Sequence, residues 1–112
     1  MDNLQQLIND IAVWSDEVFG EVSTPVAKLK HLQKEIPELI ESIEKNDSEE
    51  LRHELADCFM LLLDCARKCG FTSNDIIDAT YTKLEINKSR TWNKPNSDGV
   101  FEHVRDSSLK NY

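Results

Sequence analysis

The sequence predicts an all-α fold: a bundle of four helices followed by a turn-rich C-terminal tail. Apolar residues recur at spacings of three and four in four successive segments, which is the periodicity of amphipathic helices. Capping residues or glycines mark the ends of these segments. Helices of this length are marginally stable alone, so most of their stability must come from packing their apolar faces together. A helical bundle meets that requirement.

The first two predicted helices have clear start signals. Asp2 and Gln5 form a capping box before the first helix, which ends at Gly20. The second helix begins at Ser23-Thr24-Pro25, because proline suits the first turn of a helix, and continues to about Lys45. Both segments are amphipathic, so each has one face to pack against its neighbours.

The third predicted helix begins with a second capping box, formed by Asp47 and Glu50, and ends near Gly70. Its middle, Cys58 to Leu63, is apolar on most faces and must be buried on more than one side. Three neighbouring helices in a small monomer leave part of this surface uncovered. We therefore expect dimerisation to complete the bundle.

The fourth predicted helix starts at residues 72–73 and runs to about Arg90. The tail, residues 91–112, contains Pro95 and the turn signal Ser97-Asp98-Gly99. At 112 residues the chain has the length of a single domain, with a helical core over residues 2–90.

Charge and hydropathy narrow the classes of partner. The formal charge of -8 argues against nucleic acid or an anionic membrane as the main partner. The longest apolar run is far shorter than the roughly 20 residues that span a bilayer, and the N-terminus lacks a basic signal region. We expect a soluble cytoplasmic protein in which Cys58, Cys65 and Cys69 are small, reduced core residues.

Two acidic doublets are the strongest chemical signal. Glu35 and Glu38 lie three residues apart in the second predicted helix, and Glu54 and Asp57 lie three apart in the third. Residues at this spacing share a helix face, so antiparallel packing of the two helices brings four carboxylates together. Such a cluster is repulsive without a counter-charge, and Mg²⁺, with Mn²⁺ as a substitute, is the natural one. A solvated acidic surface is the alternative.

A basic and polar set on the fourth helix complements these acids. Lys83, Asn87 and Arg90 are spaced by four and three, so they lie on one face and are able to bind phosphate oxygens. Alternatively, the two cations merely complement the dipole at the end of the helix.

Four further residues are candidates for substrate contacts. His31 and Lys28 precede Glu35 on roughly the same helix face, where an exposed surface role is the alternative. Trp14 and Trp92 are candidates for stacking on a nucleobase. Trp14 also belongs to the apolar stripe of the first helix, so core packing is its alternative role.

The order of these motifs resembles the MazG-like all-α nucleoside triphosphate pyrophosphohydrolases. The resemblance rests on the Glu-x-x-Glu and Glu-x-x-Asp motifs and on Lys83-x-x-x-Asn87-x-x-Arg90. The fuller string is similar to the dATP/dGTP pyrophosphohydrolase branch and comprises Ser23-Thr24-Pro25, Lys28-Leu29-x-His31-Leu32, Glu54-Leu55-Ala56-Asp57, Lys83-Leu84-Glu85-x-Asn87, Arg90-x-Trp92, Asp98-Gly99-Val100 and His103-Val104.

This resemblance implies a reaction and a set of ligands. It implies hydrolysis of a deoxynucleoside triphosphate, with purine preference, between the α and β phosphates to the monophosphate and pyrophosphate. It also implies a homodimer or homotetramer. The residues implied to hold Mg²⁺ are Glu35, Glu38, Glu54 and Asp57, and those implied to hold the phosphates are Lys83, Asn87 and Arg90.

The motif carboxylates also include the candidate general base, which accepts a proton from the attacking water. We favour Glu38 over Glu35 for this role. Lys34 departs from the family pattern, because many relatives carry a second acid there, and this leaves the number of metal ions open. Pro37 interrupts the first motif and removes a backbone hydrogen bond, so we expect a local kink.

Two alternative functions follow from the same residues. A di-iron carboxylate protein requires a Glu-x-x-His motif on each of two helices, and this chain has only Glu50-x-x-His53. A helical interaction or regulatory module of the same fold, without catalysis, is the second alternative. Mg²⁺-dependent release of pyrophosphate distinguishes an enzyme from both.

Overall fold

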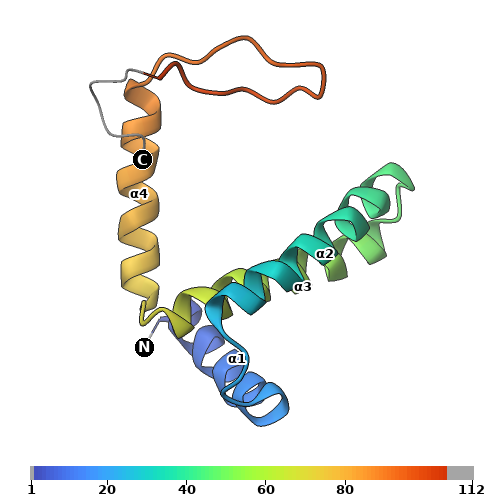
Figure 1. The fold of residues 1–112 in the computed structure, drawn as a ribbon, viewed down its shortest axis with the longest axis vertical. Helices are drawn as coiled ribbons and strands as arrows, with labels where there is room; N and C mark the ends of the chain where they lie inside the picture. Colours follow the sequence, from blue (N-terminus) through green and yellow to red (C-terminus); the bar gives the residue numbers. More distant parts are fainter. Residues whose placement is uncertain (1, 106–112) are drawn as a thin grey trace. The chain divides into compact units, whose positions relative to one another are not determined.

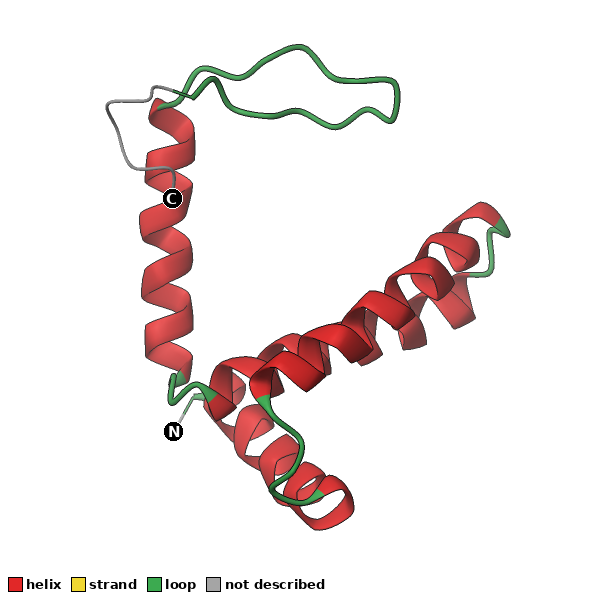
Figure 2. Cartoon of the chain, in the orientation of Figure 1, coloured by secondary structure: helices red, strands yellow, loops and turns green. Residues whose placement is uncertain are grey.

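The computed structural model describes residues 2–105, and its four helices confirm the all-α prediction (Figure 1). Within these residues there is no strand, only one isolated bridge between Trp92 and His103, and Figure 2 shows the chain after the last helix as a loop. None of the helices is long and apolar enough to span a membrane. The helices are α1 (Asn3–Phe19), α2 (Pro25–Glu44), α3 (Ser48–Lys68) and α4 (Ser73–Ser89).

Side-chain caps begin all four helices; in α4 the Thr72 hydroxyl accepts a hydrogen bond from the Asp75 backbone N–H at 3.3 Å. The Asp2 carboxylate accepts a hydrogen bond from the Gln5 backbone N–H at 2.6 Å, and Asp47 accepts one from the Glu50 N–H at 3.1 Å. The Thr24 hydroxyl accepts one from the Ala27 N–H at 3.1 Å. Each cap satisfies a backbone donor that has no partner inside the helix. The predicted ends of α2 and α4, at Lys45 and Arg90, lie one residue beyond the observed ends.

The chain divides into two compact units between Ile76 and Ile77, within α4, and each unit is described by itself. In the first unit, α2 and α3 form the most extensive helix–helix contact and α1 packs against α3 (Figure 1). Its core is small: Ile8, Ile11 and Leu63 are buried together. Many large apolar side chains of α2 and α3 stay exposed, among them Leu29, Ile36, Ile40, Ile43, Leu55, Phe59 and Leu62.

The second unit contains the rest of α4 and a folded-back tail. The Asn93 N–H donates to the Glu102 carbonyl at 2.8 Å, and the Val104 N–H donates to the Thr91 carbonyl at 2.7 Å. Between these bonds the chain reverses at Gly99, whose φ of 78° is a left-handed conformation that glycine adopts without strain. The turn predicted at residues 97–99 is therefore confirmed. The tail was predicted over residues 91–112, and its last residues, 106–112, lie outside the described part.

The three cysteines are free, as predicted, but they differ in burial. Cys58 is buried, Cys65 is partly buried and Cys69 is exposed. Burial raises the pKa of the Cys58 thiol, and the neighbouring carboxylates add to that effect. The prediction of a core position is wrong for Cys69, because this residue caps the C-terminus of α3, where the chain turns away from the core.

Candidate functional site

The α2–α3 pair brings three of the four predicted metal ligands together. One carboxylate oxygen each from Glu35, Glu38 and Glu54 lies within 4.8 Å of the other two. Glu38 is exposed, whereas Glu35 and Glu54 are partly buried. Asp57 is exposed and stands outside this cluster, but it lines the same cavity as Glu35. The antiparallel packing that the spacing predicts thus produces a carboxylate cluster.

The cluster concentrates negative charge in a partly buried place. A hydrogen bond with Glu38 raises the pKa of Glu35, and burial and repulsion from Glu38 and Glu54 raise it further; nearby His31 partly opposes this. The Glu54 Oε2 atom is buried and has no hydrogen-bond partner among the described residues. A buried carboxylate oxygen without a partner is costly. A divalent cation, which prefers oxygen ligands, supplies the missing partner and the counter-charge, so these residues fit such an ion.

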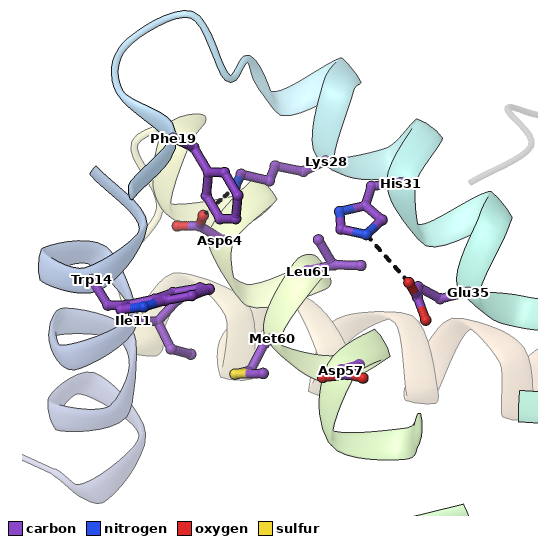
Figure 3. Close-up of a pocket in the computed structure, with 10 residues that line it drawn as sticks. All are labelled: Ile11, Trp14, Phe19, Lys28, His31, Glu35, Asp57, Met60, Leu61 and Asp64. Carbon is purple, nitrogen blue, oxygen red and sulfur yellow. Dashed lines mark ion pairs between the residues drawn. The ribbon is translucent and has the colours of Figure 1, made fainter. Parts of the chain in front are cut away.

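His31 lies beside this cluster. Its Nε2 atom is 3.3 Å from Oε1 of Glu35, one turn further along α2 (Figure 3). The imidazole is 51% exposed, so it is accessible at the rim of the site. His31 therefore has both a contact to a candidate metal ligand and a free surface for a substrate group.

A cavity of about 170 Å³ opens next to the carboxylates, between α1, α2 and α3. Figure 3 shows Trp14 and Phe19 at one end of it and Glu35 and Asp57 at the other. The two aromatic rings meet edge to face, with centroids 5.3 Å apart. Trp14 stays 52% exposed, so the core-packing alternative for this residue is wrong. The cavity therefore joins an aromatic wall to an acidic end.

The cavity wall also contains a buried polar cluster that was not predicted from the sequence. The Lys28 Nζ atom lies 3.1 Å from Oδ2 of Asp64 and donates a hydrogen bond to the Ser15 hydroxyl at 3.1 Å. The Ser15 hydroxyl in turn donates to Asp64 at 2.6 Å. All three residues are buried, and the Lys28 ammonium lies 4.3 Å from the centre of the Phe19 ring.

Two sequence signals pointed to this cluster. Ser15 interrupts the apolar stripe of α1, seven residues after Ile8, and Asp64 directly follows the apolar run that ends at Leu63. Each is a polar residue at a position where the periodicity predicts burial. Only a long-range contact satisfies such a residue, and the sequence does not identify the partner.

Arg67 extends the cluster towards the surface. Its guanidinium donates to Asp64 at 2.7 Å and to the exposed Asp16 at 3.0 Å. Burial alone raises the pKa of Asp64, but hydrogen bonds from Ser15, Arg67 and Lys28 outweigh this and hold that pKa below its ordinary value. Asp64 is therefore ionised at neutral pH.

In the second unit, the predicted phosphate-binding residues lie close to one another. The Arg90 guanidinium donates to the Asn87 side-chain oxygen at 3.2 Å, and the Trp92 indole N–H donates to the Asn87 carbonyl at 3.0 Å. Burial and the charge of Arg90 lower the pKa of Lys83. Within residues 2–105, no carboxylate forms an ion pair with Lys83 or Arg90, so two neighbouring cations are available to an anion.

Trp92 connects the tail to this cationic end of α4. Its indole contacts the His103 ring edge to face, with centroids 5.9 Å apart. His103 Nε2 is buried and lacks a hydrogen-bond partner among the described residues. Trp92 nevertheless remains 43% exposed. The tail is thus anchored at Asn87 and leaves part of the indole accessible.

Comparisons with known proteins relate this chain to one enzyme family. Residues 7–110 match the model of the dATP/dGTP pyrophosphohydrolase family. The dATP/dGTP diphosphohydrolase of cyanophage S-2L is 30% identical over 107 residues, which are 96% of this chain and 93% of that protein. A solved structure from the same phage, a MazG-like pyrophosphohydrolase bound to dGDP and three catalytic Mn²⁺ ions per active site, has a TM-score of 0.75 and 30% identity. The match covers 95% of this chain and 97% of that one.

A second phage relative matches over a shorter region. An 18.2 kDa protein from the rep-hol intergenic region of Haemophilus phage HP1 is 33% identical over 69 residues, which are 61% of this chain. The match covers 42% of that protein, so this chain corresponds to less than half of its length.

Proposed function

Because this chain belongs to the dATP/dGTP pyrophosphohydrolase family, an enzyme family of MazG-like fold, we propose that it hydrolyses a purine deoxynucleoside triphosphate between the α and β phosphates. The products are the nucleoside monophosphate and pyrophosphate. The observation that carries this proposal is the carboxylate cluster of α2 and α3, with its unpartnered Glu54 oxygen.

The cluster is the proposed metal site. Glu35, Glu38 and Glu54, together with Asp57, hold Mg²⁺, for which Mn²⁺ substitutes; the cyanophage structure with three catalytic Mn²⁺ ions supports this assignment. When bound, such ions neutralise charge on the triphosphate and lower the pKa of the attacking water. A protein of charge -8 requires this neutralisation to accept a polyanionic substrate.

Glu38 is the proposed general base. It is the more exposed of the two motif carboxylates of α2, whereas Glu35 is partly buried and already contacts His31. Water therefore reaches Glu38 more easily, and its carboxylate accepts the proton as the water oxygen bonds to phosphorus. The bond between the α and β phosphates breaks and pyrophosphate leaves. This sequence of events requires no nucleophilic side chain.

Lys83, Asn87 and Arg90 are the proposed phosphate ligands. Within residues 2–105 the two cations have no carboxylate partner, and the repulsion between them is relieved when an anion binds nearby. Because Asn87 accepts from Arg90 through its side-chain oxygen, its amide N–H₂ group is free to donate to a phosphate oxygen.

The cavity is the proposed site of the nucleoside. Trp14 offers an exposed aromatic surface for stacking on a base. Lys28 and His31, the other proposed substrate contacts, line the wall between this surface and the carboxylates; the His31 imidazole is exposed there, whereas the Lys28 ammonium is paired with Asp64. Trp92, in the second unit, is the other proposed stacking residue, because its indole stays partly exposed beside the phosphate ligands.

A second copy of the chain is the proposed partner. The exposed apolar residues of α2 lie at helical spacing, at positions 29, 36, 40 and 43, and those of α3 at positions 55, 59 and 62. Monomeric proteins rarely expose apolar stripes of this extent. A homodimer or homotetramer covers them.

The decisive experiment measures pyrophosphate release from a panel of standard and modified nucleoside triphosphates with Mg²⁺ or Mn²⁺. We expect turnover that requires metal and is highest with purine deoxynucleotides. Glu38→Gln should lower kcat at least about 100-fold, because general-base catalysis alone contributes about 10²–10⁴. Asp57→Asn should lower the metal-dependent turnover, because it removes a charged oxygen ligand of the proposed metal site. A wild-type protein that releases no pyrophosphate from any of these substrates supports the non-catalytic interaction module instead.

A further inference from the structure

Lys28, Asp64 and Ser15 form a closed set of contacts that joins three helices. The three side chains come from α2, α3 and α1 and are 4%, 3% and 1% exposed. Each touches the other two within 3.1 Å. Figure 3 shows the Lys28–Asp64 ion pair on the side of the cavity away from Glu35.

Holding helices together by such a cluster has a high cost in desolvation free energy. Removing two charges from water costs more than burying apolar side chains of the same size, and the attraction between the charges repays this only when the geometry is good. Well-packed apolar residues of similar volume often serve stability as well as a buried ion pair, or better. The cluster therefore points to a need that apolar packing does not meet.

That need is the register of α2 against α3. Apolar contact is non-directional, so two apolar helix faces tolerate sliding. An ion pair with hydrogen bonds of fixed direction does not tolerate it. The Lys28–Asp64 contact defines which residue of α2 lies level with which residue of α3.

The carboxylates occupy positions that this register controls. Glu35 lies seven residues after Lys28, and Asp57 lies seven residues before Asp64. Because the helices are antiparallel, both lie about 10.5 Å along the axes from the ion pair, on nearly the same helix faces. Three residues further in each direction, Glu38 and Glu54 come level with each other along the helix axes. A slip of one turn moves them apart by about 5.4 Å, more than the whole cluster spans.

We propose that Lys28, Asp64 and Ser15 act as a register lock that positions the carboxylate cluster for metal binding. Ser15 ties α1 to the ion pair, so the aromatic wall of the cavity keeps its place relative to the carboxylates. The lock residues are positioning residues rather than metal ligands. The inference rests on the proposed metal site, and it gives Lys28 a role beyond the substrate contact proposed above.

The test compares metal affinity with stability in full-length protein. Asp64→Asn and Lys28→Met remove one partner each, and we expect each to weaken Mn²⁺ affinity at least about tenfold by calorimetry, at a temperature where the variant is folded. Ile8→Ala is the matched control, because it removes a buried side chain of α1 that packs with Ile11 and Leu63 and forms none of the polar contacts of the lock. We expect Ile8→Ala to lower the unfolding temperature but to keep the wild-type Mn²⁺ affinity.

A double variant separates positioning from stability and also covers single variants that fail to fold. Lys28→Met/Asp64→Leu replaces the ion pair by apolar side chains, so we expect its unfolding temperature to recover towards that of the wild type. The Mn²⁺ affinity of the double variant should stay at least about tenfold weaker than that of wild type. Wild-type affinity in the folded double variant, or an equal loss of affinity in Ile8→Ala, overturns the lock. Mn²⁺ binding by wild type without pyrophosphate release overturns the proposed reaction instead and leaves the lock standing.

Discussion

At the scale of single residues, the carboxylates of the cluster differ in what surrounds them. Glu38 meets water, Glu35 contacts His31, and Glu54 has a buried oxygen with no partner in the described part of the chain. These environments suit different tasks. An exposed carboxylate is suited to proton transfer, and a buried one with a free oxygen is suited to hold a cation.

Glu54→Gln tests the buried oxygen. The substitution keeps the size of the side chain but replaces one oxygen by an N–H₂ group, which repels a cation. We expect Mn²⁺ affinity to fall at least about tenfold and pyrophosphate release to fall further. Glu49→Gln, in the exposed first turn of the same helix, is the control and should leave both unchanged. Equal effects of the two substitutions contradict the site.

Glu35→Gln tests the electrostatic repulsion within the carboxylate cluster in metal-free protein. The pKa of Glu35 is raised in the folded protein from 4.5, so the fold favours its protonated form. The stability from this group is present at low pH and is lost as pH rises through the raised pKa. We therefore expect Glu35→Gln to raise the unfolding temperature of metal-free protein at neutral pH, with a smaller gain in acid. Thermal unfolding in EDTA at several pH values measures this.

Bound metal should reverse the order of the unfolding temperatures of wild type and Glu35→Gln. A ligand present at 100 times its dissociation constant stabilises the fold by about 2.7 kcal/mol. Wild type should gain about this much with Mn²⁺, whereas Glu35→Gln should gain much less and should not turn over substrate. An unfolding temperature of wild type that does not respond to Mn²⁺ contradicts the metal site.

At the scale of elements, α2 is the central helix of the site. It carries Lys28, His31, Glu35 and Glu38 on one side and continues through Pro37 without a break in the helix. Its start is defined by the Thr24 cap, with Pro25 in the first turn. The site therefore depends on local signals that lie several turns away from the carboxylates.

Thr24→Ala tests how much the N-terminal cap of α2 contributes to the stability of the fold. Loss of the capping hydroxyl should lower the free energy of unfolding by about 1 kcal/mol, as measured in urea, while Thr24→Ser should retain most of the wild-type stability. Turnover should stay unchanged at temperatures where both variants are folded, because the cap lies outside the cavity. A large loss of kcat in Thr24→Ala contradicts this separation.

The contribution of the Lys28–Asp64–Ser15 cluster to stability should decrease in acid. The pKa of Asp64 in the folded protein lies below 3.8, its ordinary value, so the unfolded chain binds this proton more tightly. Its contribution to stability is complete above that value and is lost as pH falls towards the folded pKa. We expect the stability difference between wild type and Asp64→Asn to shrink from about pH 5 to about pH 3 in urea titrations. A constant difference contradicts the contribution of the ionised carboxylate.

At the scale of the whole molecule, the first unit has a small buried core and leaves many large apolar side chains exposed. Phe59 is 50% exposed in the middle of α3, and Ile40 is 52% exposed on α2. Sedimentation at micromolar concentration should therefore show a species heavier than one chain. Phe59→Glu should shift it towards the monomer, whereas Glu49→Gln should not. A wild-type protein that sediments as a monomer contradicts the proposed partner.

Much of the fold was predictable because its signals are local. The caps at Asp2, Thr24 and Asp47 and the turn at Gly99 depend on residues within four positions of each other, and all are confirmed. The prediction for Cys69 was wrong for a physical reason: periodicity places it on the buried stripe of α3, but the helix ends there. Trp14 stays exposed for a different reason, since the described part of the first unit has no element that covers it.

By itself, the sequence determined the four helices, the pairing of acids three residues apart and the family, because helix periodicity and motif order are properties of neighbouring positions. Only the tertiary structure decided that Ser15 and Asp64 complete the environment of Lys28, and that Glu54 rather than Asp57 joins Glu35 and Glu38. These contacts link residues that lie far apart along the chain. Their geometry depends on the register and rotation of packed helices, which local spacing does not specify.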